Sequence, residues 1–187
     1  QACKQANHLL NSGFHIPIAI NISARQFSQP DFIERLLADI EYYDVPHHLL
    51  ELELTERVIM TDIEETTETL KELEKLGIKV SVDDFGTGYS SLSYLKKFPI
   101  DVIKIDKAFV SDVDSNCEDA AIVSAIIAMA SSLGLDTVAE GVETKEQMEF
   151  LRAKHCTIGQ GYFFSKPLSC ADLHRYLNKH AGELALG

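Results

Sequence analysis

Six short apolar runs recur along the chain, and each is typical of a buried β-strand. Strands of this kind are commonly about four to eight residues long and rich in Val, Ile and Leu. The runs cover Ile16–Ser23, Leu49–Thr55, Lys79–Asp84, Asp101–Asp106, Asp136–Glu140 and Thr157–Phe163. They predict six strands, each separated from the next by a longer segment.

The segments between these runs place their apolar residues at helical spacing. Asp31–Tyr43 has one apolar face, and Asp62–Leu76 directs its apolar residues inward while its charged residues form a solvated face. Asp119–Leu133 is apolar nearly all round, which is typical of a well-buried helix, and Gly134 provides a stop signal. The pattern therefore predicts helices that alternate with strands.

The two ends of the chain carry weaker signals. Ser169 is a typical N-cap and predicts a last helix that reaches about Lys179, with a frayed tail over residues 181–187. Residues 1–10 read as the end of a helix already under way, and the first residue is Gln1, not Met. We therefore expect the chain to be a piece of a longer polypeptide.

Alternating strands and helices predict an α/β fold with a parallel sheet, either doubly wound or closed as a (β/α)₈ barrel. Polar side chains at the strand ends favour the barrel, since a barrel gathers all carboxyl ends at one mouth. These residues are Asn21, Glu53, Asp83, Lys104, Glu140 and Gln160. Six strands are two short of a barrel. We expect residues 1–187 to be the C-terminal portion of a TIM-type barrel, about six βα units, whose first two strands lie upstream.

The charge, the cysteines and the apolar stretches of the sequence disfavour several kinds of partner and location. The 17 Lys and Arg residues against 29 Asp and Glu residues give a formal charge of −12, which disfavours binding to DNA, RNA or an anionic membrane. The four cysteines are scattered, so reduced thiols in the cytoplasm are expected rather than disulfides or zinc. The longest apolar stretch, from Ala121, is too short for a membrane span.

Candidate metal ligands stand at the strand ends. Oxygen-only side chains in one place favour Mg²⁺ or Mn²⁺. A single such carboxylate would more simply cap a helix or pair with a lysine, but five oxygen side chains at converging strand ends favour a metal site. The neighbours Asp83 and Asp84 suit a two-metal arrangement. The full set is Asn21, Glu53, Asp83, Asp84 and Glu140.

Other residues of the mouth allow more than one interpretation. Lys104 either hydrogen-bonds a reacting water and stabilises negative charge, or forms a structural ion pair with Asp106 or Glu140. Gly86 and Gly88 predict a tight turn. The DFG triplet at Asp84 has none of the other protein-kinase motifs beside it. The histidines fall mainly on helices and loops, so surface positions without partners are expected.

Six motifs in order resemble the EAL domain, a family of bacterial cyclic di-GMP phosphodiesterases. They are NIS ending the run at Asn21, ELTE from Glu53, DDFGTGYSSL from Asp83, KID from Lys104, AEGVE from Ala139 and QGYFFSKP from Gln160. The resemblance runs across nearly the whole chain. The usual serine after Glu56 is replaced by Arg57, and the glutamate-alanine-leucine segment that names the family, with the arginine after it, is not in this sequence.

The resemblance implies a role for each matching residue. Asn21, Glu53 and Asp83 would bind a first metal ion, and Asp83, Asp84 and Glu140 a second. Lys104 would contact the nucleophilic water, Gln160 the reacting phosphate, and Glu140 would assist catalysis. The substrate would lie near Glu143, Asp106 and Pro167. The loop after Asp83 would be stabilised by Glu56, Gly86, Thr87 and Gly88.

The resemblance also implies a function. Hydrolysis of cyclic di-GMP to linear pGpG with two Mg²⁺ or Mn²⁺ ions is expected, in a homodimer formed through the Asp83–Phe98 region, where Tyr89, Leu92, Tyr94 and Leu95 offer apolar contacts. A silent receptor for cyclic di-GMP or for a protein, and an unrelated magnesium-dependent barrel enzyme, are the alternatives. Flanking sensory or GGDEF domains and membrane tethering of the parent are open. The 187 residues alone are expected to be weakly active or inactive.

Overall fold

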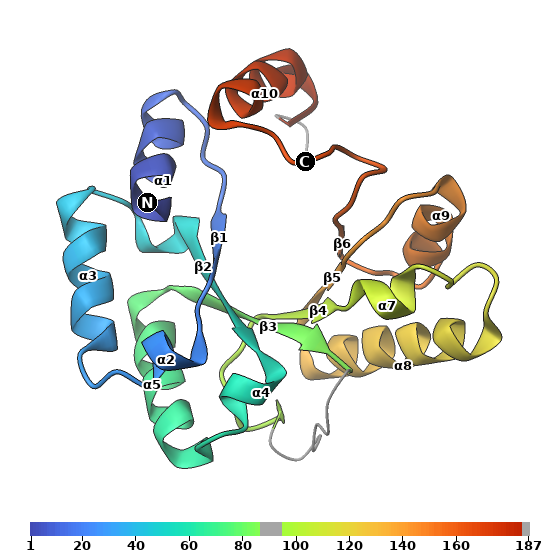
Figure 1. Cartoon of the computed structure of the whole chain (residues 1–187), viewed down its shortest axis with the longest axis horizontal. Coiled ribbons are helices and arrows are strands. Elements are labelled where there is room, and N and C mark those ends of the chain that lie inside the picture. Colours follow the sequence, from blue (N-terminus) through green and yellow to red (C-terminus); the bar gives the residue numbers. More distant parts are fainter. Residues whose placement is uncertain (87–94, 185–187) are drawn as a thin grey trace.

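The computed structural model describes residues 1–86 and 95–184, and its centre is one sheet of six parallel strands in chain order (Figure 1). Because neighbours in the sequence are neighbours in the sheet, every crossover turns the same way and the sheet curls. The edge strands are the first and the last. The strands are β1 Ile18–Asn21, β2 Leu50–Thr55, β3 Lys79–Phe85, β4 Val102–Ile105, β5 Asp136–Ala139 and β6 Ile158–Gly159.

Helices connect the strands and cover the outside of the curled sheet (Figure 1). The longer ones are α1 Ala2–Asn11, α3 Phe32–Tyr42, α5 Ile63–Leu76, α8 Cys117–Leu133, α9 Lys145–Ala153 and α10 Cys170–Leu184. Single turns of helix follow three of the strand ends: α2 Ala24–Phe27, α4 Glu56–Ile59 and α7 Lys107–Val110. A 3₁₀ turn, η1 His47–Leu49, leads into β2.

The four inner strands match their predicted runs closely, whereas the two outer strands are shorter than predicted. β1 has four residues against eight, and β6 has two against seven. Neither outer strand is fully buried. Each has a partner strand on one side only, so fewer residues are held in a ladder.

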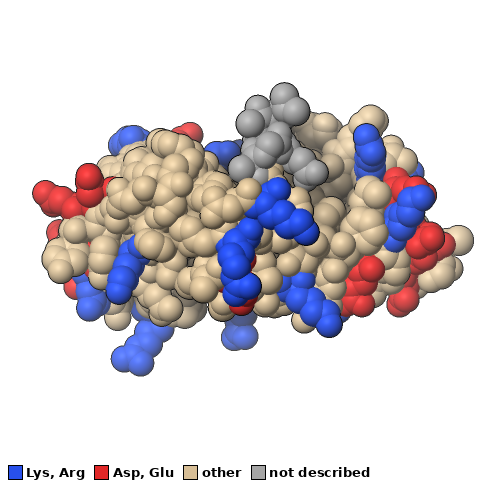
Figure 2. Space-filling model, turned by 90° about the horizontal axis from the view of Figure 1, so that it is seen from above, with Lys and Arg blue, Asp and Glu red and all other residues tan. Residues whose placement is uncertain are grey.

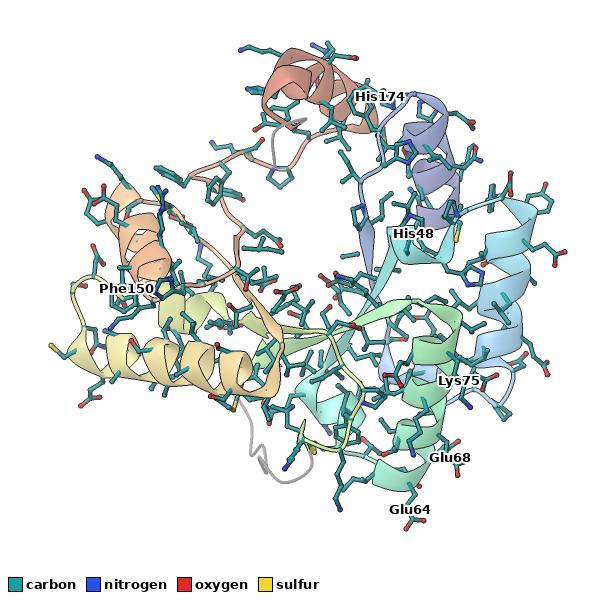
Figure 3. The ribbon with its side chains drawn as sticks, turned by 180° about the vertical axis from the view of Figure 1, so that it is seen from behind. His48, Glu64, Glu68, Lys75, Phe150 and His174 are labelled. Atoms are coloured by element: carbon teal, nitrogen blue, oxygen red, sulfur yellow. The ribbon has the colours of Figure 1, made fainter. Side chains whose placement is uncertain are left out.

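Capping residues set the helix ends. The Asp62 side chain accepts a hydrogen bond from the Glu65 N–H and starts α5, and Gly77 ends it in the left-handed conformation, at φ +73°. Asn116 likewise caps α8, which begins two residues before the predicted start, and Gly134 ends it at φ +74°. On α5, Glu64, Glu68 and Lys75 project away from the sheet, which confirms the solvated face (Figure 3).

One helix prediction needs correction. α8 is not buried all round: its packed side is made by Val123, Ile126, Ile127 and Ala130, while Ile122 is 39% exposed. A helix lying on one face of a sheet is covered on that face only.

The core lies between the sheet and its helices. Leu52 and Leu54 of β2, Val80 and Val82 of β3, and Ile103 and Ile105 of β4 are almost completely buried. Since successive side chains of a strand point to opposite faces, the residues between them, Glu53, Ser81 and Lys104, point to the inner face. The apolar positions thus build the outer layer, and the polar ones are left for the inside of the curl.

The last helix lies beside the first (Figure 1). α10 extends to Leu184, five residues past its predicted end at Lys179. The His174 ring packs on His8 of α1, with 4.6 Å between ring centroids (Figure 3). In addition, His47 Nδ1 lies 2.7 Å from the Leu76 carbonyl oxygen. The expectation that the histidines have no partners is therefore wrong for these residues.

Charge is spread unevenly over the surface. Figure 2 shows several Lys and Arg side chains in the middle of the face seen from above, with Asp and Glu mainly toward its two ends. Among the helices of the described residues, none combines the length and the apolar character that a membrane span requires.

Candidate active site

Three carboxylates surround one lysine at the carboxyl ends of the inner strands. Lys104 Nζ lies 2.7 Å from Glu53 Oε1, 3.2 Å from Asp83 Oδ1 and 2.7 Å from Glu140 Oε1. The lysine and the three carboxylates come from four different places: Glu53 from β2, Asp83 from β3, Lys104 from β4 and Glu140 from the position after β5. The parallel register thus brings together four of the residues selected from the sequence.

This cluster is shielded from water and is short of positive charge. Lys104 is 4% exposed and Glu53 is 8% exposed. Burial by itself would lower the pKa of Lys104, but hydrogen bonds and charges from Glu140 and Glu53 outweigh it and hold the pKa above its ordinary value. Lys104 therefore stays protonated. One ammonium among three carboxylates leaves an excess of two negative charges.

A β-bulge explains how both Asp83 and Asp84 reach the mouth. Val82 pairs with Ile103 and Phe85 with Ile105, so two residues of β3 stand opposite one residue of β4. Asp84 has φ +55°, and its N–H donates to Asp83 Oδ1 over 3.1 Å. Bulges of this kind redirect side chains and often lie next to active sites. Strand alternation alone would have sent the two carboxylates to opposite faces.

The surroundings of Asp84 are strongly acidic. Burial first, and then the negative charges of Asp83, Asp106 and Glu140 together with a hydrogen bond to Asp106, raise the pKa of the Asp84 carboxyl. Carboxyl groups that repel one another in this way are stabilised by a proton or by a cation.

Two other candidates lie at the edges of the cluster. Asn21, at the end of β1, pairs in register with Glu53. Gln160 directly follows β6; its N–H donates to the Ala139 carbonyl and its own carbonyl accepts from the Val142 N–H. Both side chains are exposed, at the carboxyl ends of the two outer strands. The structure therefore places Asn21 and Gln160 on either side of the cluster formed by the inner strands.

Glu56 contacts the loop that follows β3. This residue begins α4 and is buried, and its Oε2 accepts a hydrogen bond from the Gly86 N–H over 3.3 Å. Gly86 has φ +96°, which confirms the tight turn expected there. Thr87 and Gly88 lie outside the described residues. The Arg57 side chain, which stands where the family usually has serine, is exposed.

The proposed substrate-side residues have partners of their own. The Asp106 side chain caps α7 by accepting from the Ala108 N–H over 2.6 Å, so the alternative in which Lys104 pairs with Asp106 is wrong and pairing with Glu140 is found instead. Glu143 forms an ion pair with Lys107. Pro167 is exposed in the segment between β6 and α10.

Sequence reasoning missed Lys107 and Gln147. Gln147 is only 5% exposed, and its side chain joins the segment after β5 to the end of α7. The spacing of Thr144 and Gln147 is that of a capping box, which indicates the start of α9. The distant partner, Ser111, has no signal in the sequence.

The cluster is not a preformed metal cage. Within residues 1–86 and 95–184, no three His, Cys, Asp or Glu side chains are grouped so as to hold a metal ion. The carboxylate oxygens of Glu53, Asp83 and Glu140 face the Lys104 ammonium instead. An all-oxygen donor set with excess negative charge nevertheless fits a hard divalent cation in its chemistry.

Fold and site together define a β/α-barrel protein with an acidic site at the carboxyl ends of its strands. The chain belongs to the EAL domain family, whose model matches residues 1–167. The solved EAL structures are TIM-type barrels, which confirms the predicted fold class and the resemblance. The curled six-stranded parallel sheet corresponds to part of such a barrel.

Characterised relatives cover the chain almost completely. Cyclic di-GMP phosphodiesterase NbdA of Pseudomonas aeruginosa is 40% identical over 99% of the chain. The cyclic di-GMP complex of the phosphodiesterase PaMucR, from the same organism, has a TM-score of 0.89 and 39% identity, over 92% of this chain and 70% of that one. The manganese and cyclic di-GMP complex of Klebsiella pneumoniae BlrP1 has a TM-score of 0.80 and 32% identity, over 89% and 42%. The chain spans only 22–24% of the length of the first curated relatives.

Proposed function

We propose that the protein carrying this chain is a phosphodiesterase that hydrolyses cyclic di-GMP to linear pGpG. The observation that carries the proposal is the buried Lys104 with its three carboxylates at the carboxyl ends of the strands. Family membership, a relative named as a cyclic di-GMP phosphodiesterase and a homologous structure with cyclic di-GMP bound support it. The alternative of a silent receptor is disfavoured, because every carboxylate that the family motifs require in this stretch is present.

The donor set suits two divalent cations. Asn21, Glu53 and Asp83 would hold the first and Asp83, Asp84 and Glu140 the second, and the excess negative charge around Lys104 supports this assignment. The BlrP1 complex contains manganese, so Mn²⁺ or Mg²⁺ is the natural choice. When bound, such ions supply electrostatic stabilisation of the attacking and leaving oxygens of a phosphoryl transfer.

Three residues of the chain would orient the attacking water, accept its proton and bind the reacting phosphate. Lys104 is held in its charged form and is therefore a hydrogen-bond donor, suited to orient the attacking water and to stabilise negative charge on the phosphate. Glu140, whose Oε1 lies 2.7 Å from Lys104 Nζ, would accept a proton from that water as the water oxygen bonds to phosphorus and the bond from phosphorus to the 3′ oxygen breaks. Gln160 would hydrogen-bond the reacting phosphate.

Other residues around the mouth would contact the substrate or stabilise the loop after β3. Glu143, Asp106 and Pro167 would lie against cyclic di-GMP. Glu56, through its hydrogen bond to the Gly86 N–H, would fix the loop that continues into Thr87 and Gly88.

The decisive experiment incubates the full-length protein with cyclic di-GMP and Mn²⁺ and separates the products by chromatography. A pGpG peak is expected. Binding of cyclic di-GMP with no pGpG formed would favour the receptor and overturn the proposal.

Asp83→Asn provides the matched variant, because it keeps the size of the side chain and removes its charge. Loss of a carboxylate from the charged cluster should lower turnover by about 10² or more. Unchanged turnover in a folded Asp83→Asn protein would contradict the role of Asp83 as the shared ligand.

A further inference from the structure

Gln147 is the buried link between two loops of the mouth. Its Oε1 accepts hydrogen bonds from the Glu143 N–H over 2.7 Å and the Thr144 N–H over 3.0 Å. Its Nε2 donates over 2.8 Å to the carbonyl oxygen of Ser111, which ends α7. A capping box requires only the contacts at the start of α9. The bond to Ser111 crosses 36 positions of the chain and is additional.

The contacts of Gln147 belong to a closed circuit. Ser111 N–H and Oγ both donate to the Lys107 carbonyl oxygen, and Lys107 Nζ pairs with Glu143, whose N–H returns to Gln147. We name these four residues, Lys107, Ser111, Glu143 and Gln147, the α7–α9 circuit. It joins two elements that lie side by side in Figure 1.

Gly141, the residue that follows Glu140, lies against the Lys107 side chain of this circuit. The aliphatic part of Lys107 lies so close to Gly141 that an added Cβ would come within 2.3 Å of Lys107 Cγ, and Gly141 has φ +69°. On its other side the same segment is bonded to the residue that follows β6, since the Val142 N–H donates to the Gln160 carbonyl over 3.0 Å. The segment 140–144 is therefore held from both sides, and Gln147 supplies the buried contact on the α7 side.

We propose that Gln147 is a positioning residue, which holds segment 140–144 against α7 so that Glu140 reaches Lys104 and Glu143 reaches Lys107. The inference rests on the proposed function for its kinetic consequence, and on geometry alone for the position of the segment. Residues that orient an active group through hydrogen bonds, without touching the reacting atoms, typically contribute about 10–100-fold to activity or metal affinity.

The test uses Gln147→Glu and Gln147→Met in the full-length protein. Gln147→Glu keeps the acceptor needed for the cap and loses the donor to Ser111. Gln147→Met has similar volume, adds no charge and loses all the hydrogen bonds. Gln26→Glu and Gln26→Met are matched controls, because Gln26 forms the same capping box with Ser23 on α2 but is exposed.

At a temperature at which both Gln147 variants are folded, we expect their kcat/KM for cyclic di-GMP to be at least ~10-fold lower than that of the wild-type protein. Hydrogen exchange of the backbone amides in segment 140–144, followed by mass spectrometry, should become faster in Gln147→Met. The Gln26 variants should change exchange only near Ser23–Phe27 and leave kcat/KM within about twofold of wild type. A capping role alone would give Gln147→Glu wild-type kinetics.

The outcomes separate the two proposals. Wild-type kcat/KM and unchanged exchange in a folded Gln147→Met would overturn the positioning role while the phosphodiesterase proposal stands. If the wild-type protein forms no pGpG, the proposed function fails, and exchange at 140–144 still decides whether Gln147 holds the segment. If Gln147→Glu does not fold, Gln147→Met, which adds no charge, still tests through kcat/KM and exchange at 140–144 whether Gln147 holds the segment.

Discussion

At the residue scale, the positive charge of Lys104 compensates part of the negative charge of the candidate site. Its ammonium lies within 3.2 Å of carboxylate oxygens from Glu53, Asp83 and Glu140, which stand at or near the carboxyl ends of three different strands. Removing one partner from a buried ionic cluster commonly costs about 3–5 kcal/mol, because the remaining charges stay buried and uncompensated. Three carboxylates without their lysine are an extreme form of this situation.

Lys104→Met should therefore lower the unfolding free energy by about 3 kcal/mol or more at pH 7. Because the folded-state pKa of Lys104 is raised, its contribution is complete below the ordinary lysine pKa of about 10.4 and is lost only as pH rises through the folded-state value. The deficit should thus be constant from about pH 6 to 9. Urea unfolding of the wild-type protein and of Lys104→Met at several pH values in this range measures the difference in unfolding free energy. A difference below about 1 kcal/mol would contradict the electrostatic explanation.

Asp84 provides a prediction of opposite sign. Its carboxyl pKa is raised in the folded state, so its ionisation disfavours folding and stability falls as pH rises through the interval between the unfolded and folded values. Asp84→Asn should raise the unfolding midpoint at pH 7 by up to ~3 °C and flatten the pH dependence of stability just above the ordinary Asp pKa of about 3.9. Activity should fall at the same time, since a proposed metal ligand is lost.

Asp44→Asn is the matched control for Asp84. Asp44 is also exposed and also has positive φ, at +49°, but lies before β2 and outside the acidic cluster. Its replacement tests whether Asn simply suits the left-handed backbone better than Asp. An equal rise in midpoint for both variants would assign the effect to the backbone and not to charge.

At the scale of elements, the segment after β5 and the segment after β6 pack closely against each other at Val142 and Gly161. An added Cβ at Gly161 would lie 2.2 Å from the Val142 carbonyl oxygen and 2.3 Å from its nitrogen, both backbone atoms that cannot turn away. Only glycine lets these two loops lie against each other. The same approach brings the Gln160 carbonyl to the Val142 N–H.

Gly161→Ala should consequently lower the unfolding free energy by more than ~2 kcal/mol. Gly77→Ala is the control, because nothing lies within 4 Å of an added Cβ there and only the φ of +73° opposes it, at about 1 kcal/mol. Chemical denaturation of both variants gives the comparison. A smaller loss for Gly161→Ala than for Gly77→Ala would show that the segment moves apart at little cost.

At the scale of the whole molecule, the expected dimer remains a prediction, with one part of it revised. Leu95 was expected to offer an apolar contact to a second copy, but it is buried within its own chain, as is Phe98. Tyr89, Leu92 and Tyr94 lie outside the described residues. A side chain already covered by its own core adds no new area to an interface, so the contact would have to come from the rest of the Asp83–Phe98 region.

We expect light scattering of the full-length protein to show a dimer at micromolar concentration. Replacing Leu92 by Asp should shift it toward monomer, while replacing Tyr42, an exposed residue at the end of α3, should leave it unchanged. A monomer at all concentrations would contradict the assembly.

The sequence by itself determined the order of the strands, the packed and solvated faces of α5 and the identity of the acidic residues. These properties depend on short-range periodicity and on stop signals such as Gly134, which act within a few residues. The parallel crossovers then place the strand ends at one mouth, which is why Glu53, Asp83, Lys104 and Glu140 were selected correctly as neighbours.

Only the tertiary structure decided how these residues meet. The bulge that redirects Asp84 depends on pairing between β3 and β4, and the choice of Glu140 over Asp106 as partner of Lys104 depends on Asp106 being taken by the Ala108 N–H. The link from Gln147 to Ser111 joins positions 36 residues apart. Local patterns fix which way a side chain faces, but contacts between distant segments depend on the register and height at which whole elements pack.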